Sequence, residues 1–406
     1  MRSPFFLVAA MCVAEIFGMA AFATFPALLP TFQVEWGLSN TEAGWINAIY
    51  YFGYLTAVLI LVSLTDRIDP KKIYLACMAL TVAATGGFAL LAEGFWSALL
   101  LRSLAGIGLA GTYMPGLKLL SDLIEGPTQS RAVAFYTSSF GIGSSASYYF
   151  SGKSQLLVDW PTTFALAALG PAVALGLVWL LIPGAGAVRA GDAGGVTIGN
   201  FLRVLRNRRA MGYVLAYAVH NFELFGLRSW MVAYLAFIVK RRPPGTLFFT
   251  PTTLAALVNL MGLPASVTGN ELAARFGRPQ LVSMVMSVSA LVAFSLGLLA
   301  GMPGWVIIAV FLLYGGLAVG ESASVTAGAV GQAEPGFRGT TMAVHASIGF
   351  LGSFLGPLVF GIVLDLSGGG LVAESWGLAF TVMGLTVATG PFLVLFLSGG
   401  DPGEEG

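Results

Sequence analysis

The sequence predicts an all-α integral membrane protein with twelve transmembrane helices in two pseudo-symmetric six-helix bundles. Of the 406 residues, 57% are hydrophobic and 10% are charged, whereas a soluble globular protein carries about 25% charged residues. The apolar residues occur in long blocks and not in amphipathic stripes. One long polar, glycine-rich segment separates six of these blocks from six others. These three observations together define the fold class.

Each apolar block is long enough to cross a hydrocarbon core of about 30 Å. The first block resembles a signal peptide, but the acid in its core and its length favour a membrane helix. We expect an N-terminal bundle at 1–184, a cytoplasmic linker at 185–208 and a C-terminal bundle at 209–406, and "FLRVLRN" within the linker fits a short amphipathic surface helix. The predicted spans are 5–29, 42–64, 72–92, 95–120, 131–152, 162–183, 210–238, 247–268, 280–301, 304–330, 340–364 and 375–398.

Basic residues in the connections predict the orientation of the helices. With the N-terminus in the cytoplasm, 13 lysines and arginines lie on that side and 4 on the other. The remaining 3 are Arg102, Lys118 and Arg228, which lie inside helices. We therefore expect a multi-pass protein of the inner (cytoplasmic) membrane with both termini in the cytoplasm.

The composition disfavours several other classes of protein. A net charge of +1 supplies no field that attracts nucleic acid. Cys12 and Cys77 lie in apolar helices without metal-finger or redox spacing. No His-Glu-x-x-His or Gly-x-Ser-x-Gly motif of an intramembrane enzyme is present, and the loops are too short for a receptor or assembly protein. We expect no enzymatic activity, no cofactor, no resident metal, and a monomer surrounded by lipid.

A constant shift of 208 residues aligns landmarks of the two halves, which indicates an internal repeat. The stretch "GLA" at 108–110 matches "GLA" at 316–318. The same shift carries Glu15 onto Glu223, so "EIFG" at 15–18 corresponds to "ELFG" at 223–226. Each half is therefore predicted to carry an acid in its first helix.

Two motifs resemble those of the Major Facilitator Superfamily, and the resemblance covers essentially the whole chain. "LTDRIDPKK" at 64–72 resembles the family loop Gly-x-Leu-Ala-Asp-Arg-x-Gly-Arg-Lys, and "RSLAGIGLAG" at 102–111 matches Arg-x-x-x-Gly-x-Gly-x-Ala. The second-half loop, "NELAARFGR" at 270–278, keeps Arg275 but has Ala274 for the acid. The resemblance implies a gating role for Asp66, Arg67 and Arg275; the alternative is a solvated turn. The glycines at 106–111 are expected to pack helices closely.

In this family the first, fourth, seventh and tenth helices line a central path, so the resemblance places the site candidates there. Helical spacing puts Glu15 on one face with Phe22, and Glu223 on one face with His220 and Trp230. Glu321 lies 208 residues after Tyr113, on the equivalent face. The predicted substrate-binding residues are Arg102, Tyr113, His220, Arg228, Trp230 and Tyr314.

Glu15, Glu223 and Glu321 are predicted to carry protons. A low-dielectric path penalises an ionised carboxylate, so each acid could take up a proton on one side and release it on the other. The alternative is that these acids pair with Arg102 or Arg228 and lock helices together. A guanidinium also suits capture of a substrate carboxylate, whereas Arg228 could instead reach the outer headgroups.

We therefore expect a secondary active transporter that moves a small organic solute, more plausibly an anion, by alternating access and in symport with protons. The fifth helix, "GIGSSASYYFSG" at 141–152, lacks the family's antiporter motif, which favours symport or uniport. One alternative is efflux of amphipathic drugs, which needs a large apolar cavity. Another is transport of a divalent metal ion, with Cys12, Glu15, His220 and Glu223 as ligands.

Overall fold

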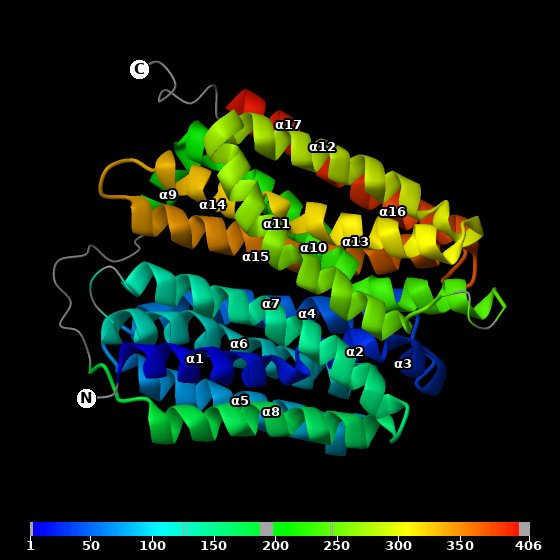
Figure 1. The fold of residues 1–406 in the computed structure, drawn as a ribbon, viewed down its shortest axis with the longest axis horizontal. Coiled ribbons are helices and arrows are strands. Elements are labelled where there is room, and N and C mark those ends of the chain that lie inside the picture. The colour runs from blue at the N-terminus through cyan, green and yellow to red at the C-terminus, as the bar shows by residue number, and fades with distance from the viewer. Residues whose placement is uncertain are drawn as a thin grey trace. The chain divides into compact units, whose positions relative to one another are not determined.

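The computed structural model describes residues 3–124, 126, 128–186, 198–243, 245 and 247–397. These residues form helices and connections, without a β-strand in the described ranges (Figure 1). The all-α prediction is therefore confirmed. The chain divides into two compact units: unit 1 is Met1–Leu38, Trp45–Ala193 and Pro251–Leu260, and unit 2 is Ser39–Gly44, Gly194–Thr250 and Met261–Gly406.

The helices that precede residue 187 contribute almost entirely to unit 1. They are α1 (Pro4–Gly18), η1 (Met19–Ala21), α2 (Thr24–Ala27), α3 (Leu29–Glu35), α4 (Asn40–Leu64), α5 (Pro70–Leu91), α6 (Phe95–Leu123), α7 (Thr128–Gln155) and α8 (Trp160–Leu181).

The helices that follow residue 197 contribute mainly to unit 2. They are α9 (Ile198–Arg206), α10 (Arg208–Lys240), α11 (Pro251–Phe276), α12 (Arg278–Leu296), η2 (Leu299–Gly301), α13 (Gly304–Gly320), α14 (Ser322–Gly331), α15 (Arg338–Leu366), α16 (Ala373–Ala388), α17 (Gly390–Phe392) and the π-helix η3 (Leu393–Leu397).

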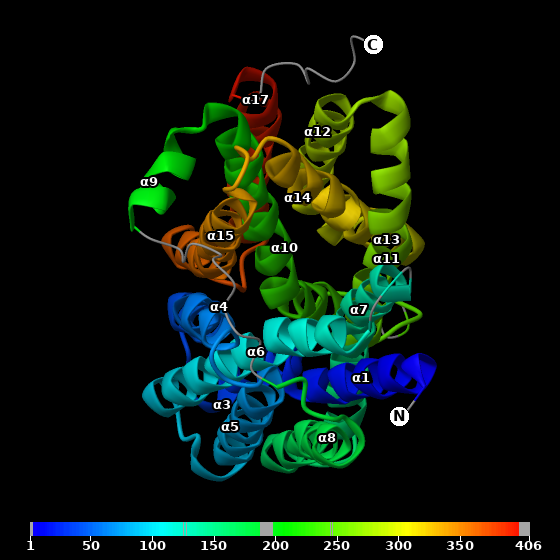
Figure 2. The same cartoon turned by 90° about the vertical axis from the view of Figure 1, so that its left-hand side faces the viewer.

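Each unit encloses an apolar core between its long helices. In unit 1, α5 packs against α6 and α8, and α1 packs against α7 and α8 (Figure 2). Met11 and Met78 lie in the core of this unit. In unit 2, α10 packs against α14 and α15, and α12 packs against α16. Met286 and Val325 lie in that core.

Eleven of the described helices or helix pairs are long and apolar enough to span a membrane. The remaining predicted span, the fifth at 131–152, corresponds to α7, a single helix of 28 residues. At 1.5 Å per residue its length is about 42 Å, which is enough to cross a bilayer. Its serine and tyrosine side chains explain why it is less apolar than the other eleven.

The sequence pattern predicted one continuous helix for the first span. The structure shows that this span is interrupted, because a serine of another helix binds its backbone. The Ser147 hydroxyl of α7 accepts a hydrogen bond from the amide of Ala23 at 3.0 Å and donates one to the carbonyl of Ala20 at 2.6 Å. These backbone groups therefore leave the regular helical ladder, and the chain passes through the 3₁₀ turn η1 into α2.

The tenth predicted span is also interrupted, at Glu321. This residue lies between α13 and α14: its amide turns back to the carbonyl of Val319, whereas its carbonyl accepts a helical hydrogen bond from the amide of Val325 at 2.9 Å. A Cβ atom added to Gly269 of α11 would overlap the carbonyl oxygen of Gly320. The backbone of α11 therefore packs directly against this interruption.

The glycines of α6 pack helices closely, which confirms the prediction from "RSLAGIGLAG". An added Cβ at Gly106 would overlap the carbonyl oxygen of Tyr50 in α4. One at Gly108 would overlap the Thr81 hydroxyl of α5. A dinucleotide-binding role would require a strand before these glycines, and they lie instead inside one long helix.

The two halves follow the same order of helices, as the sequence repeat predicted. The shift of 208 residues carries Pro70, the first residue of α5, onto Arg278, the first residue of α12. The predicted short helix in the linker is α9, whereas residues 187–197 of that linker lie outside the described residues. The predicted bundle boundaries and the membrane-surface position of α9 stay predictions.

Candidate functional site

Arg102, the single arginine of α6, is buried and lies in an aromatic cage within unit 1. Its side chain is 3% exposed. The guanidinium carbon lies 4.2 Å from the ring centroid of Tyr50 and 5.7 Å from that of Phe25. In the described part of the chain Arg102 forms no ion pair, and its Nε has no hydrogen-bond partner. The cage therefore holds a cation without an anion.

A small cavity adjoins this guanidinium. Its volume is about 20 Å³, and Phe22, Thr81 and Thr85 line it together with Tyr50 and Arg102. A cavity needs roughly 10–15 Å³ to hold one water molecule. The site in this conformation therefore has room for water but not for an organic solute.

Glu15 is buried in the core of unit 1. The Tyr136 hydroxyl of α7 donates a hydrogen bond to Oε2 of Glu15 at 2.9 Å, whereas Oε1 has no partner. Tyr74 of α5 lies near the same carboxylate, and Tyr113 stacks on Tyr136 with ring centroids 6.0 Å apart. The acid and Tyr113 therefore belong to one buried cluster of tyrosines.

Glu223 has a similar environment in unit 2. The Ser289 hydroxyl of α12 donates a hydrogen bond to its Oε1 at 2.7 Å, and Oε2 has no well-aligned partner. Tyr314 of α13 approaches this carboxylate, and Glu321 lies close enough for the two charges to interact. The fold therefore brings together three predicted site residues, Glu223, Tyr314 and Glu321.

His220 and Glu321 form an ion pair inside unit 2. The distance from Nδ1 of His220 to Oε1 of Glu321 is 2.9 Å, and the two side chains are 1% and 0% exposed. The pair joins α10 to the residue that separates α13 from α14. His220 was predicted to bind substrate, and here its ring contacts a carboxylate instead.

Trp230 and Arg228 pack within unit 2. Trp230 is completely buried, donates from its indole to the carbonyl of Pro357 at 2.9 Å, and stacks on Phe360 at 5.5 Å. These contacts join α10 to α15, as in a packing residue. The guanidinium of Arg228 lies 5.3 Å from the ring centroid of Phe225.

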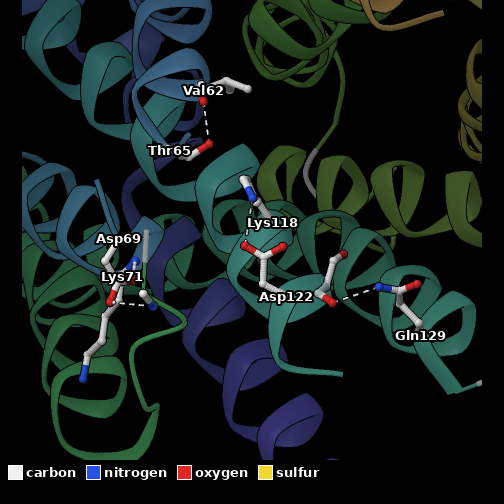
Figure 3. A network of polar contacts seen from close by, with 9 residues as sticks. Val62, Thr65, Asp69, Lys71, Lys118, Asp122 and Gln129 are labelled. Carbon is white, nitrogen blue, oxygen red and sulfur yellow. Dashed lines mark hydrogen bonds and ion pairs between the residues drawn. The ribbon is translucent and has the colours of Figure 1, made fainter. Parts of the chain in front are cut away.

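The predicted gating residues lie on exposed helix ends. Asp66 and Arg67 follow α4, and Arg275 lies in the last turn of α11. Near the first two residues, Asp69 caps α5 by accepting a hydrogen bond from the Lys71 amide at 2.9 Å. Figure 3 shows this cap and its neighbours. In the described ranges no ion pair involves Asp66, Arg67 or Arg275.

Lys118 is separate from the cluster around Arg102 although both lie on α6. It forms a partly exposed ion pair with Asp122, one turn later, at 2.8 Å (Figure 3).

Across the residues that the structure describes, no three histidine, cysteine, aspartate or glutamate side chains gather closely enough to hold a metal ion. Cys12 and Glu15 lie in unit 1, and His220 and Glu223 lie in unit 2. The metal-ion alternative therefore has no donor cluster of the required kind in either unit.

Sequence reasoning missed the residues that contact the predicted ones. Tyr50, Tyr136 and Ser289 lie on helices that were not assigned to the path. A polar hydroxyl in an apolar helix is a weak signal, because serines and tyrosines also bond to their own helix. Ser347, for example, donates only to the carbonyl of Ala343.

Ionisable groups buried inside long apolar helices mark the pathways of substrates, ions or protons in membrane proteins. The family model described as Major Facilitator Superfamily matches residues 10–357. The chain therefore belongs to the Major Facilitator Superfamily, and it is a multi-pass membrane protein of a family of transporters and not of enzymes.

Curated relatives are about a quarter identical to this chain over the residues that align. Protein spinster homolog 1 from Homo sapiens is 24% identical over 188 residues, which cover 45% of this chain and 35% of that protein. The niacin transporter NiaP from Acinetobacter baylyi is 26% identical over an alignment that covers 29% of this chain and 26% of that protein. The gentisate transporter from Corynebacterium glutamicum is 23% identical over an alignment that covers 81% of this chain and 74% of that protein. The chain thus spans about one third of the length of the first curated relatives that it matches.

Solved structures show the same fold. The crystal structure of the nucleoside transporter NupG has a TM-score of 0.80 with this protein at 13% identity, and the match covers 97% of this chain and 100% of that one. This similarity concerns the fold alone, because the sequence identity is low.

Proposed function

We propose that this protein is a secondary active transporter for a small organic carboxylate, driven by protons through alternating access. The observation that carries the proposal is Arg102, a buried cation without an anionic partner in the described residues. An unpaired buried charge is costly. A substrate carboxylate would repay that cost through two parallel N–H···O bonds to the guanidinium.

The chemistry of the relatives' substrates supports a carboxylate. Niacin and gentisate, which two relatives are named for, are aromatic rings that carry a carboxylate. The cage around Arg102 offers the aromatic faces of Tyr50 and Phe25 beside the guanidinium. We propose that the solute's carboxylate binds Arg102 and that its ring contacts these aromatic side chains after the cavity widens.

Proton coupling is supported by the burial of Glu15, Glu223 and Glu321. None of them has a lysine or arginine partner within the described ranges. The alternative, in which they lock helices by pairing with Arg102 or Arg228, is therefore absent from this conformation. A buried acid without a cation partner is held more easily when protonated, so it can carry a proton between the two sides.

We further propose that both termini lie in the cytoplasm and that the protein works as a monomeric symporter of the inner membrane. The distribution of basic residues supports the orientation. Single cysteines placed in the termini and labelled with an impermeant maleimide in intact cells would test it.

Uptake of nicotinate and gentisate into proteoliposomes tests the proposed function. We expect accumulation of at least one of them when the outside is more acidic than the lumen, and none of uridine. Glu15→Gln and Glu223→Gln should reduce the dependence on the pH gradient. Unchanged dependence in both variants would reject their role in proton transfer, and no uptake of either carboxylate would reject the substrate class.

A second candidate function is efflux of amphipathic compounds. The observation that favours it is an apolar cavity of about 410 Å³ in unit 1, lined by residues of α1, α7 and α8 such as Phe17, Phe150 and Leu169. Extrusion of ethidium from the same proteoliposomes, with nicotinate uptake absent, would support this candidate over the first.

A further inference from the structure

The inference concerns His220 and rests on the proposed proton coupling. His220 and Glu321 contact each other at 2.9 Å and are both excluded from solvent. The second carboxylate oxygen of Glu321 has no hydrogen-bond partner. In the described residues the hydrogen-bond partner of the Glu321 carboxylate is thus the imidazole of His220.

Several polar groups face this pair from the helices that pack around it. Tyr217, one turn before His220 on α10, stacks on the His220 ring at 5.6 Å and on the His345 ring at 4.0 Å. His345 approaches the Thr326 hydroxyl at 3.2 Å. The groups facing the pair are Tyr217 and Glu223 of α10, Ser289 of α12, Tyr314 of α13, Thr326 of α14 and His345 of α15.

The charges of this cluster balance only when it holds protons. Neither Glu223 nor Glu321 has a lysine or arginine partner in the described part of unit 2. With one proton shared between His220 and Glu321 and one on Glu223, the cluster is neutral. Loss of either proton leaves a buried negative charge, which is costly without a cation beside it. The protons of such a cluster belong to the group and not to single residues.

The position of the pair connects protonation to the backbone. Glu321 is the residue at which the tenth span is interrupted, and His220 lies in the middle of α10. A break in the helical hydrogen bonds is a place at which a helix can change direction. A change of charge at the pair therefore changes the interaction that holds the junction of α13 and α14 to α10.

We propose that His220 and Glu321 hold the transported proton as one unit, and that its release loosens the junction between α13 and α14. On release the proton passes from the shared hydrogen bond to water on the receiving side, leaving a neutral imidazole beside an ionised Glu321. His220 is thus a proton-carrying residue and does not bind the substrate. Unit 1 has no such pair, because the shift of 208 residues places Cys12 and Tyr113 at these positions.

Transport assays on the full chain test this role. Proteoliposomes are assayed with nicotinate for accumulation driven by a pH gradient and for exchange at equal pH. We expect His220→Gln and Glu321→Gln to lose accumulation and to retain exchange, which needs no net proton movement. Ser347→Ala on α15 is the control and should retain both, because the Ser347 hydroxyl donates to the carbonyl of Ala343 in its own helix. Wild-type accumulation in His220→Gln, or loss of exchange as well as accumulation, would overturn the proposal.

Infrared titration of the purified protein separates this inference from the proposed function. The carbonyl band of protonated carboxyl groups is followed between about pH 5 and pH 8, the range in which histidine titrates. Glu321→Gln should remove part of the titrating band, His220→Gln should shift its midpoint, and the control Ser347→Ala should leave it unchanged. An unshifted band in His220→Gln would reject the shared proton. A shifted band without gradient-driven uptake of nicotinate in the wild type would reject the transport proposal alone.

Discussion

Replacing Arg102 with lysine tests the substrate-binding role of its guanidinium. Lysine keeps the positive charge near Tyr50 but cannot form two parallel bonds to a carboxylate. A hydrogen bond to a charged group contributes about 1.5–3 kcal/mol. Loss of one of the two bonds should therefore weaken binding of nicotinate by about 10- to 150-fold, since about 1.4 kcal/mol corresponds to a factor of ten.

The assay is a comparison of nicotinate with nicotinamide, which has the same ring without the carboxylate. Dissociation constants are measured by calorimetry on detergent-purified protein. Wild type should prefer nicotinate, and Arg102→Lys should lose most of this preference while its affinity for nicotinamide stays nearly constant. Lys118→Arg on the same helix is the control, because Lys118 pairs with Asp122 away from the cage.

Two results would refute the reasoning. An unchanged preference for nicotinate in Arg102→Lys would show that the guanidinium does not bind the carboxylate. An equal loss of affinity for both compounds, together with a lower unfolding temperature, would show that Arg102 acts by holding α6 against Tyr50 and not by binding the solute.

Three further predictions concern stability in detergent, measured by thermal unfolding. Gly106→Ala should lower the free energy of unfolding by about 1–3 kcal/mol, because its Cβ overlaps the Tyr50 carbonyl, whereas Gly86→Ala, with open space at its Cβ, should not. Asp69→Ala should cost about 0.5–2 kcal/mol through loss of the cap of α5, and Asp69→Asn should cost less. Tyr136→Phe should lower the free energy of unfolding by about 1–3 kcal/mol, since Oε2 of Glu15 loses its donor. Wild-type stability in this variant would show that the contact does not stabilise the protein.

The positions of the spans could be predicted from the sequence, because crossing a bilayer demands about 20 apolar residues in a row. The interruption of the first span could not. The residue that causes it, Ser147, lies 124 residues after Ala23. A local pattern contains no information on which distant hydroxyl will bind a backbone group.

The candidate site was partly predictable for a similar reason. Glu15 and Arg102 could be found because a charge in an apolar helix is costly and stands out in the sequence. The pairing of His220 with Glu321 could not be found, because 101 residues separate the two. Helical spacing placed Trp230 on the face of Glu223, but its indole bonds to Pro357, since spacing does not show which neighbour a face meets.

The contact between α10 and α15 limits how unit 2 can move. An added Cβ at Gly352 would overlap the carbonyl oxygen of Ala218, and one at Gly356 would overlap that of Phe222, one turn later. Sliding either helix by one residue would move a side chain into a carbonyl oxygen. The two helices therefore cannot shift along each other. The two helices should therefore move as one rigid body. The distance between a probe attached to α10 and one attached to α15 should stay constant through the transport cycle.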